Sequence, residues 1–132
     1  MKNYKAEYEH LVRLNKVLEN RIPETLAGLT KLQRHHSMNG DLPAKTKELV
    51  ALGIAVTSQC EGSAITHLYD ALKVGASRAE IEEVLTVAVM MGGSPALIMA
   101  GITLEALDQY EAENSPAHLF GPSDAVDSWG WS

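Results

Sequence analysis

The amino-acid sequence predicts an all-α domain of about six helices. Apolar residues recur at helical spacing along most of the chain, whereas the alternating pattern typical of strands is nearly absent. The signals between these apolar segments are those of helix ends, with proline or serine where a helix should begin and glycine where one should stop. Hydrophobic residues make up 45% of the chain and aromatic residues only 5%, so we expect an aliphatic core.

The N-terminal part of the chain should form three helices. An amphipathic pattern covers about residues 4–20. Pro23 suits the first position of a second helix, because a backbone N–H would be unpaired there anyway, and the Ser-Met-Asn-Gly segment at 37–40 marks its end. The Asp-Leu-Pro segment that follows introduces a third helix, over about residues 44–58.

The fourth and fifth helices are bounded by caps. The fourth should run from near Cys60 to Val74, and Gly75 closes it because glycine readily adopts the left-handed conformation of a C-terminal cap. The Ser-Arg-Ala-Glu segment at 77–80 is a capping box, which opens the fifth helix. The Gly-Gly pair at 92–93 should end it.

The sixth helix begins at the Ser-Pro pair 94–95 and ends near residue 113. The composition then changes to proline, serine, glycine, aspartate and two tryptophans, which indicates an irregular segment. We therefore expect one helical domain over residues 1–113 and an irregular C-terminal tail over residues 114–132.

Three helical segments are too apolar for a lone small domain. Residues 49–56 carry no polar side chain, residues 84–91 only Thr86, and residues 96–104 only Thr103. A helix that is apolar on all sides must be covered on all sides, and a chain of 132 residues has too few other elements to cover three such helices. We therefore expect a homo-oligomer with a helical interface.

Charge and cysteine content exclude several classes of protein. The formal net charge is −6 and lysines and arginines form no long block, which argues against nucleic acid as a main partner. The single cysteine cannot form an internal disulfide and fits a reducing compartment. The N-terminus lacks the apolar core of a signal peptide, and no apolar run is long enough to span a membrane. We expect a cytoplasmic protein with no membrane partner.

Four residues could build one small reactive site. Cys60, Ser63 and His67 fall on one stripe of the fourth helix, because residues three or four apart are neighbours on a helix surface. Cys60 should sit in the first turn, where the helix dipole and free N–H groups favour a thiolate. Glu48 shares a face of the third helix with Leu52 and Ala55, so its carboxylate should point along a buried stripe and suit proton transfer.

Each of these residues also has an ordinary structural interpretation. Glu48 could be a first-turn acid facing water, His67 a structural histidine, Cys60 a small buried hydrophobe and Ser63 helix filler. A metal site is a weak alternative, because Cys60 and His67 supply two ligands where structural zinc needs four. The adjacent His35 and His36 point about 100° apart on a helix and cannot easily face one metal. We expect no metal and no cofactor.

The residues around this site resemble the carboxymuconolactone decarboxylase family, and within it the AhpD-like alkyl hydroperoxidase branch. The resemblance rests on KELVAL at 47–52, CEGS at 60–63 with His67, and ALKVGA at 71–76. The later EIEEVL at 80–85 and MGGSPA at 91–96 also match the pattern of the family. The resemblance covers about residues 22–110 and implies an AhpD-like all-α domain assembled as a trimer or hexamer.

The resemblance also implies a mechanism. In the peroxidase branch a glutamate and a histidine act with water as a proton relay that activates one of two cysteines, and this pair cycles between dithiol and disulfide. Carried over, the glutamate is Glu48, the first cysteine is Cys60 and the histidine is His67. This chain departs from the pattern at Ser63, which stands at the position of the second cysteine and cannot form the disulfide.

Three functions therefore stay open. Cys60 could act alone as a peroxiredoxin-like hydroperoxide reductase, forming a sulfenic acid that a thiol reductant or partner protein resolves, with Ser63 donating a hydrogen bond to the thiolate. The lactone decarboxylases of the family work without a cysteine pair, so Glu48 and His67 could instead handle protons in a lyase acting on a small carboxylate or lactone. The third alternative is a non-catalytic, oligomeric binding protein.

Overall fold

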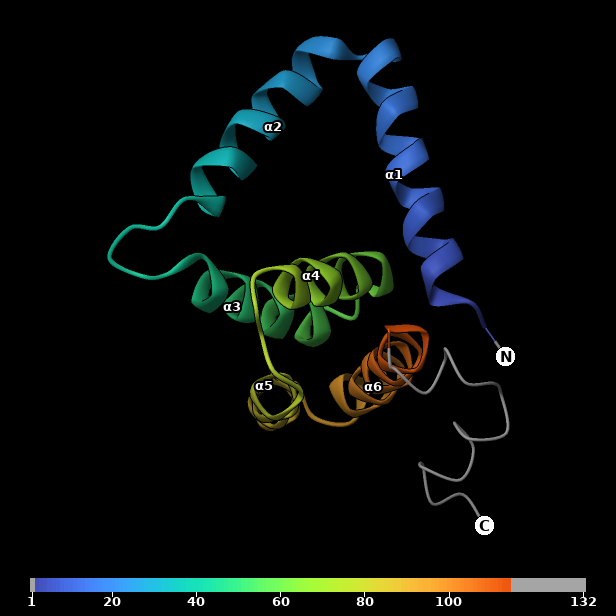
Figure 1. Cartoon of the computed structure of the whole chain (residues 1–132), viewed down its shortest axis with the longest axis vertical. Coiled ribbons are helices and arrows are strands. Elements are labelled where there is room, and N and C mark those ends of the chain that lie inside the picture. Colours follow the sequence, from blue (N-terminus) through green and yellow to red (C-terminus); the bar gives the residue numbers. More distant parts are fainter. Residues whose placement is uncertain (1, 115–132) are drawn as a thin grey trace.

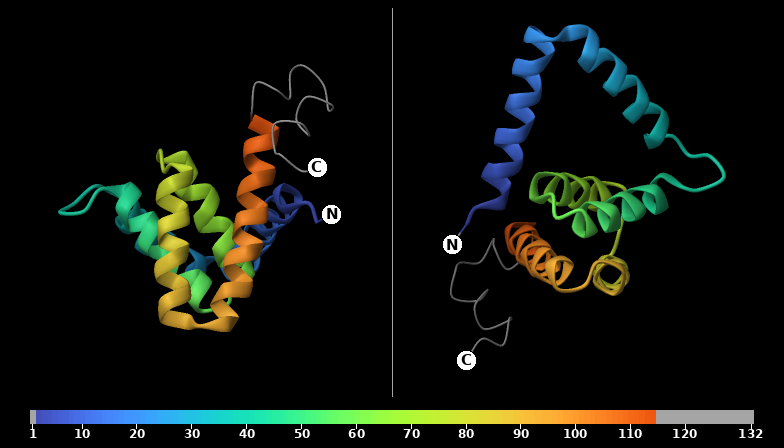
Figure 2. Two further views of the ribbon diagram at one scale, coloured as in Figure 1. Left: turned by 90° about the horizontal axis from the view of Figure 1, so that it is seen from below. Right: turned by 180° about the vertical axis from the view of Figure 1, so that it is seen from behind.

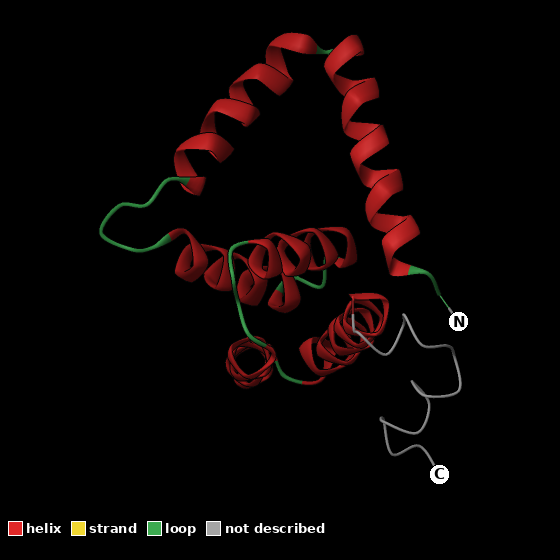
Figure 3. Cartoon of the chain, viewed as in Figure 1, coloured by secondary structure: helices red, strands yellow, loops and turns green. Residues whose placement is uncertain are grey.

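The computed structural model of the chain describes residues 2–114. In this part of the chain every regular element is a helix, which confirms the predicted all-α fold (Figure 3). The six helices are α1 (Tyr4–Arg21), α2 (Pro23–Ser37), α3 (Ala44–Thr57), α4 (Glu61–Lys73), α5 (Arg78–Gly92) and α6 (Ser94–Asn114). The predicted tail lies outside the described residues except for Asn114, which belongs to α6 rather than to the tail.

Local sequence signals account for most of these helix ends. Pro23 begins α2. The capping box of α5 is complete, because the Ser77 hydroxyl accepts from the Glu80 N–H at 3.1 Å and the Glu80 carboxylate accepts from the Ser77 N–H at 2.9 Å. Gly75 follows α4 with φ +93°, the left-handed conformation that favours glycine.

The turn between α3 and α4 differs from the prediction. Cys60 is the N-cap residue of α4 and not part of its first turn. Two residues of turn precede it, and Gln59 adopts φ 58°, which is uncommon for a residue other than glycine. The Cys60 N–H donates to the Ala55 carbonyl of α3 at 3.2 Å, and α4 begins at the next residue, Glu61.

Helices α3 to α6 form the body of the molecule, with α3 packed against α4 and α5, and α5 against α6 (Figure 1). Their shared core is aliphatic, as expected from the composition. Its largest fully buried side chains are Leu52, Val56, Ile65, Leu68, Thr103, Leu107 and Ile81.

Helices α1 and α2 extend away from this body and meet at an angle, so we call them the arms (Figure 2). The first residues of α1 hold it to the body: Tyr4 is buried, and its hydroxyl donates to Glu105 of α6 at 2.8 Å. The far end of α2 returns to α3 through the loop at residues 38–43. Between these ends the arms are largely exposed.

Large apolar side chains remain exposed on a single copy of the chain. On the body they are Val50, Ile54, Val87, Met90, Met91, Leu97 and Ile98. On the arms they are Val12, Leu14, Val17, Leu18, Ile22, Leu29 and Leu32. The three all-round apolar segments are therefore buried on one side only.

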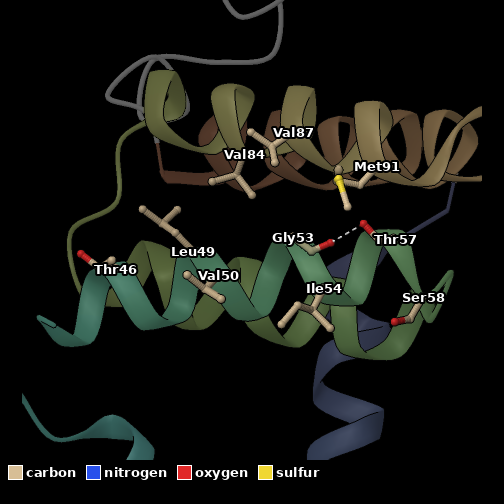
Figure 4. Close-up of a pocket in the computed structure, with 11 residues that line it drawn as sticks. Thr46, Leu49, Val50, Gly53, Ile54, Thr57, Ser58, Val84, Val87 and Met91 are labelled. Carbon is tan, nitrogen blue, oxygen red and sulfur yellow. Dashed lines mark hydrogen bonds between the residues drawn. The ribbon is translucent and has the colours of Figure 1, made fainter.

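An apolar groove of about 480 Å³ lies between α3 and α5. Leu49, Gly53 and Ile54 on α3 line it together with Val84, Val87 and Met91 on α5 (Figure 4).

None of the helices in the described part of the chain is long and apolar enough to cross a membrane.

Candidate functional site

Glu48 lies on the buried face of α3. It is 6% exposed, beside Leu52 at 0% and Ala55 at 4%, so the stripe seen in the sequence faces the interior. The alternative of a first-turn acid facing water is wrong. A carboxylate in such a position needs polar partners, since burying an unpaired charge is costly.

Two imidazoles from different helices supply these partners. His67 Nδ1 on α4 lies 3.0 Å from Glu48 Oε2, and His36 Nε2 on α2 lies 2.9 Å from Glu48 Oε1. Both histidine side chains are about one-third exposed, at 29% and 32%, so each imidazole also reaches solvent. The carboxylate therefore joins α2, α3 and α4 at one point.

His36 is a site residue whose partnership with Glu48 the sequence pattern does not predict. In the sequence it stands beside His35, and nothing in this adjacency indicates a partner on the next helix. The available signal was its place in the last turn of α2, just before the short loop that turns the chain into α3. A loop of this length keeps the end of one helix close to the start of the next.

Asp70 extends the cluster by one turn of α4. The ligand-bearing atoms of Glu48, His67 and Asp70 all lie within 4.8 Å of one another. Burial raises the pKa of the Asp70 carboxyl, and the negative charge of Glu48 raises it further, while Lys73, His67 and His36 act in the opposite direction. Two carboxyl groups thus share a confined, partly buried space.

A small cavity of about 210 Å³ opens beside these carboxylates. Ser37, Ala44, Glu48, Asp70, Lys73 and Val74 line it. Lys73 is the cationic group at its edge, and its ammonium donates to the Tyr8 hydroxyl at 2.8 Å.

Cys60 lies at the N-terminus of α4 and is exposed. The Ser63 hydroxyl lowers the pKa of the thiol by stabilising the thiolate, and the backbone N–H groups of Ser63 and Gly62 lower it further, while burial opposes them with an effect smaller than either contribution of Ser63. The structure thus places Ser63 beside Cys60, with an electrostatic setting that favours the reactive form of sulfur.

The site consists of two pairs of side chains, each with one member on α4. Glu48 with His67 is one pair and Cys60 with Ser63 is the other. Cys60 precedes His67 by seven residues, roughly 10 Å along a helix axis, whereas Ser63 precedes it by a single turn. Ser63 therefore occupies the position between the thiol and the imidazole.

Comparison with known proteins places these residues in a family. The model of the carboxymuconolactone decarboxylase family matches residues 23–104. An uncharacterized protein from Cupriavidus necator is 31% identical over 90 residues, covering 68% of this chain and 80% of the relative. One from Methanocaldococcus jannaschii is 34% identical over 94 residues, covering 70% and 89%.

Solved structures agree with this match. A carboxymuconolactone decarboxylase family protein from Legionella pneumophila superposes with a TM-score of 0.77 at 33% identity, over 81% of this chain and 96% of that one. A Thermotoga maritima protein superposes with a TM-score of 0.76 at 26% identity, over 82% and 96%. The family match covers more than half of the chain and includes Glu48, Cys60, Ser63 and His67. The chain therefore belongs to the carboxymuconolactone decarboxylase family.

Proposed function

We propose that the protein is a thiol-dependent antioxidant oxidoreductase that reduces small hydroperoxides through Cys60. The observation that carries the proposal is the accessibility of this thiol together with surroundings that stabilise its thiolate. It is exposed, it lies at a helix N-terminus, and its pKa is lowered by the neighbouring Ser63. A thiolate is the nucleophilic form of cysteine, and exposure gives a peroxide access to it.

The reaction begins with attack of the Cys60 thiolate on the terminal oxygen of a hydroperoxide. The S–O bond forms as the O–O bond breaks, so the cysteine is oxidised to sulfenic acid and the peroxide is reduced to an alcohol, whose oxygen takes up a proton. A small thiol then attacks the sulfenic sulfur, releasing water and leaving a mixed disulfide. A second thiol restores Cys60 and leaves as the disulfide of the reductant.

In this proposal Glu48 and His67 handle the protons. Glu48 holds His67 Nδ1 at 3.0 Å and so fixes the orientation of the imidazole. The separation along α4 gives His67 no direct route to the thiol, and the Ser63 hydroxyl, with water, is the link that we infer. Ser63 would thus serve the thiolate in the position where the AhpD-like branch has a second cysteine.

A further solved structure with this fold is described in functional terms. A second Thermotoga maritima structure, with a TM-score of 0.76 at 23% identity over 84% of this chain and 95% of that one, is described as a family protein with a possible role in the antioxidative response. A likeness at this identity shows the fold alone. The proposal therefore depends on Cys60 and its surroundings.

A lyase acting on a small carboxylate or lactone is less well supported by the site. The cavity beside Glu48 does contain a cation, Lys73, that could attract such a substrate. Glu48 and Asp70 line the same cavity, however, and Lys73 is engaged by the Tyr8 hydroxyl. Two carboxylates would oppose entry of an anion.

The working unit in this proposal is a homo-oligomer, a trimer or a hexamer. The apolar groove between α3 and α5 and the exposed apolar residues of the arms support it, because a second copy would remove these surfaces from water. A thiol reductant or a partner protein with a free cysteine would complete the cycle.

The test combines peroxide consumption with alkylation of Cys60 over a range of pH. Cys60→Ser should abolish consumption, His67→Ala should slow alkylation, and Ser63→Cys should create a disulfide-forming pair. His35→Ala is the control, because His35 is an exposed neighbour on α2 outside the site. If the wild-type thiol alkylates no faster than free cysteine at neutral pH, and peroxide leaves it unchanged, the redox proposal fails.

A further inference from the structure

The cluster around Glu48 combines side chains that bind metals. His36 contributes an imidazole from the end of α2, Glu48 a carboxylate from α3, and His67 and Asp70 an imidazole and a carboxylate from α4. On the sequence, Cys60 and His67 offered only two ligands. The fold instead assembles two nitrogen and two oxygen donors from three helices.

We propose that His36, Glu48, His67 and Asp70 form a binding site for one divalent transition-metal ion, of which Zn²⁺ fits best. Imidazole nitrogen and carboxylate oxygen are both ordinary zinc ligands, and four protein ligands complete a tetrahedral shell. The thiol of Cys60 takes no part in this site.

The spacing of the donor atoms fits such an ion. Tetrahedral zinc with bonds of about 2.0–2.1 Å requires ligand atoms roughly 3.3 Å apart. His36 Nε2 and His67 Nδ1 lie 2.9 Å and 3.0 Å from the two oxygens of Glu48, and Glu48, His67 and Asp70 offer atoms within 4.8 Å of one another. Glu48, His67 and Asp70 form the compact part of the site, whereas His36 contacts the other oxygen of Glu48, so its imidazole has to turn toward the ion for all four donors to bind.

The position of Asp70 also supports a metal site. His67 and Asp70 are three residues apart on α4, so both side chains lie on the face that is turned toward Glu48. Asp70 is only partly exposed, and it makes no hydrogen bond or ion pair with another side chain among residues 2–114. A cation between Glu48 and Asp70 would replace the repulsion of two carboxylates by attraction to a shared charge.

The site is also accessible. The cavity of about 210 Å³ is lined by Glu48 and Asp70, so an ion can approach the two carboxylates from this side. Lys73 on its rim would oppose a cation, but its ammonium is directed to the Tyr8 hydroxyl at 2.8 Å.

The metal site does not depend on the proposed redox function. Both use Glu48 and His67, however, so an ion held by these residues would withdraw them from proton transfer. Zn²⁺ binding is measured without peroxide, and peroxide reduction by Cys60 is measured in EDTA. Either property can therefore be absent while the other is present.

The experiment is a titration of the tag-free full chain with Zn²⁺ by calorimetry after treatment with EDTA, and with Co²⁺ by visible absorption. We expect one ion per protomer and the intense visible bands of four-coordinate Co²⁺. Asp70→Asn and His36→Gln should each weaken Zn²⁺ binding by more than about tenfold, because loss of a ligand costs at least as much as loss of a supporting residue.

Two control variants make the result specific. His35→Gln removes the adjacent, exposed imidazole, and Cys60→Ser removes the thiol; neither should change the affinity. Circular dichroism confirms that each variant is folded. The proposal is overturned if the wild type shows no saturable binding, if Asp70→Asn and His36→Gln bind as tightly as the wild type, or if Cys60→Ser removes the binding.

Discussion

Glu48 Oε2 lies 3.0 Å from His67 Nδ1, although the two residues come from different helices and are separated by 19 positions in the chain. The second oxygen of the same carboxylate lies 2.9 Å from His36 Nε2. One buried side chain therefore fixes two imidazoles, and its loss would leave polar groups of both without a partner.

Replacement of Glu48 should affect stability as well as activity. Glu48→Ala is expected to lower the free energy of unfolding by about 1–3 kcal/mol, because it removes the hydrogen bonds of one buried carboxylate to two imidazoles. Glu48→Gln keeps the size and a hydrogen-bonding group, so it should lose less. Urea unfolding of the two variants in EDTA measures the difference, and equal midpoints for Glu48→Ala and the wild type would contradict it.

Ser63→Ala should raise the pKa of Cys60. The Ser63 hydroxyl is the largest of the effects that lower this pKa, so its removal destabilises the thiolate and reduces the fraction present at neutral pH. The rate of alkylation at pH 7 should fall, and its pH profile should shift to higher pH. Ser58→Ala, at an exposed serine two residues before Cys60, provides the control and should leave the profile in place.

Asp70→Asn should stabilise the metal-free protein at neutral pH. The pKa of Asp70 is raised in the fold, so the folded state favours the protonated form and loses stability as the pH rises through the folded pKa. Asparagine carries no charge and escapes this loss. The variant should unfold at higher urea than the wild type at pH 7 in EDTA, and the difference should vanish near pH 3, where aspartate is protonated in both states.

Gly93 is required by the corner between α5 and α6. Its backbone adopts φ 69° and ψ −152°, a conformation essentially confined to glycine. An alanine Cβ would meet no atom within 4 Å, so the expected cost of Gly93→Ala, about 1–3 kcal/mol, is purely conformational. Gly101→Ala also meets no atom within 4 Å, but its φ is that of an ordinary helix, and it should preserve or raise stability.

The oligomer can be tested through the groove between α3 and α5. Light scattering should give a mass above the 14.3 kDa of one chain at micromolar concentration. Ile54→Lys should lower the mass, because Ile54 lines the groove and is 61% exposed in a single copy, so a buried interface would have to take up a charge. A wild-type mass of one chain would contradict the prediction.

The sequence predicted the features that depend on neighbouring residues. The capping box at Ser77, the start of α2 at Pro23 and the buried stripe of Glu48 follow from local chemistry and from helical periodicity. The partnership of His36 with Glu48 could not be read in this way, since it depends on how α2 docks against α3. The exact start of α4 could not be predicted either, because Gln59 adopts a positive φ of 58° and glutamine is not a residue type that indicates such a turn.

The arms have a consequence for the dynamics of the chain. From Val12 to His35 the only buried residue is Leu26, so little apolar packing opposes local unfolding of this segment in an isolated copy. Its backbone amides should exchange hydrogen with solvent much faster than those of α3 and α4. If copies associate through the arms, these amides should exchange more slowly as the protein concentration rises. Hydrogen exchange measured at several concentrations would then report assembly as an ordering of residues 12–35.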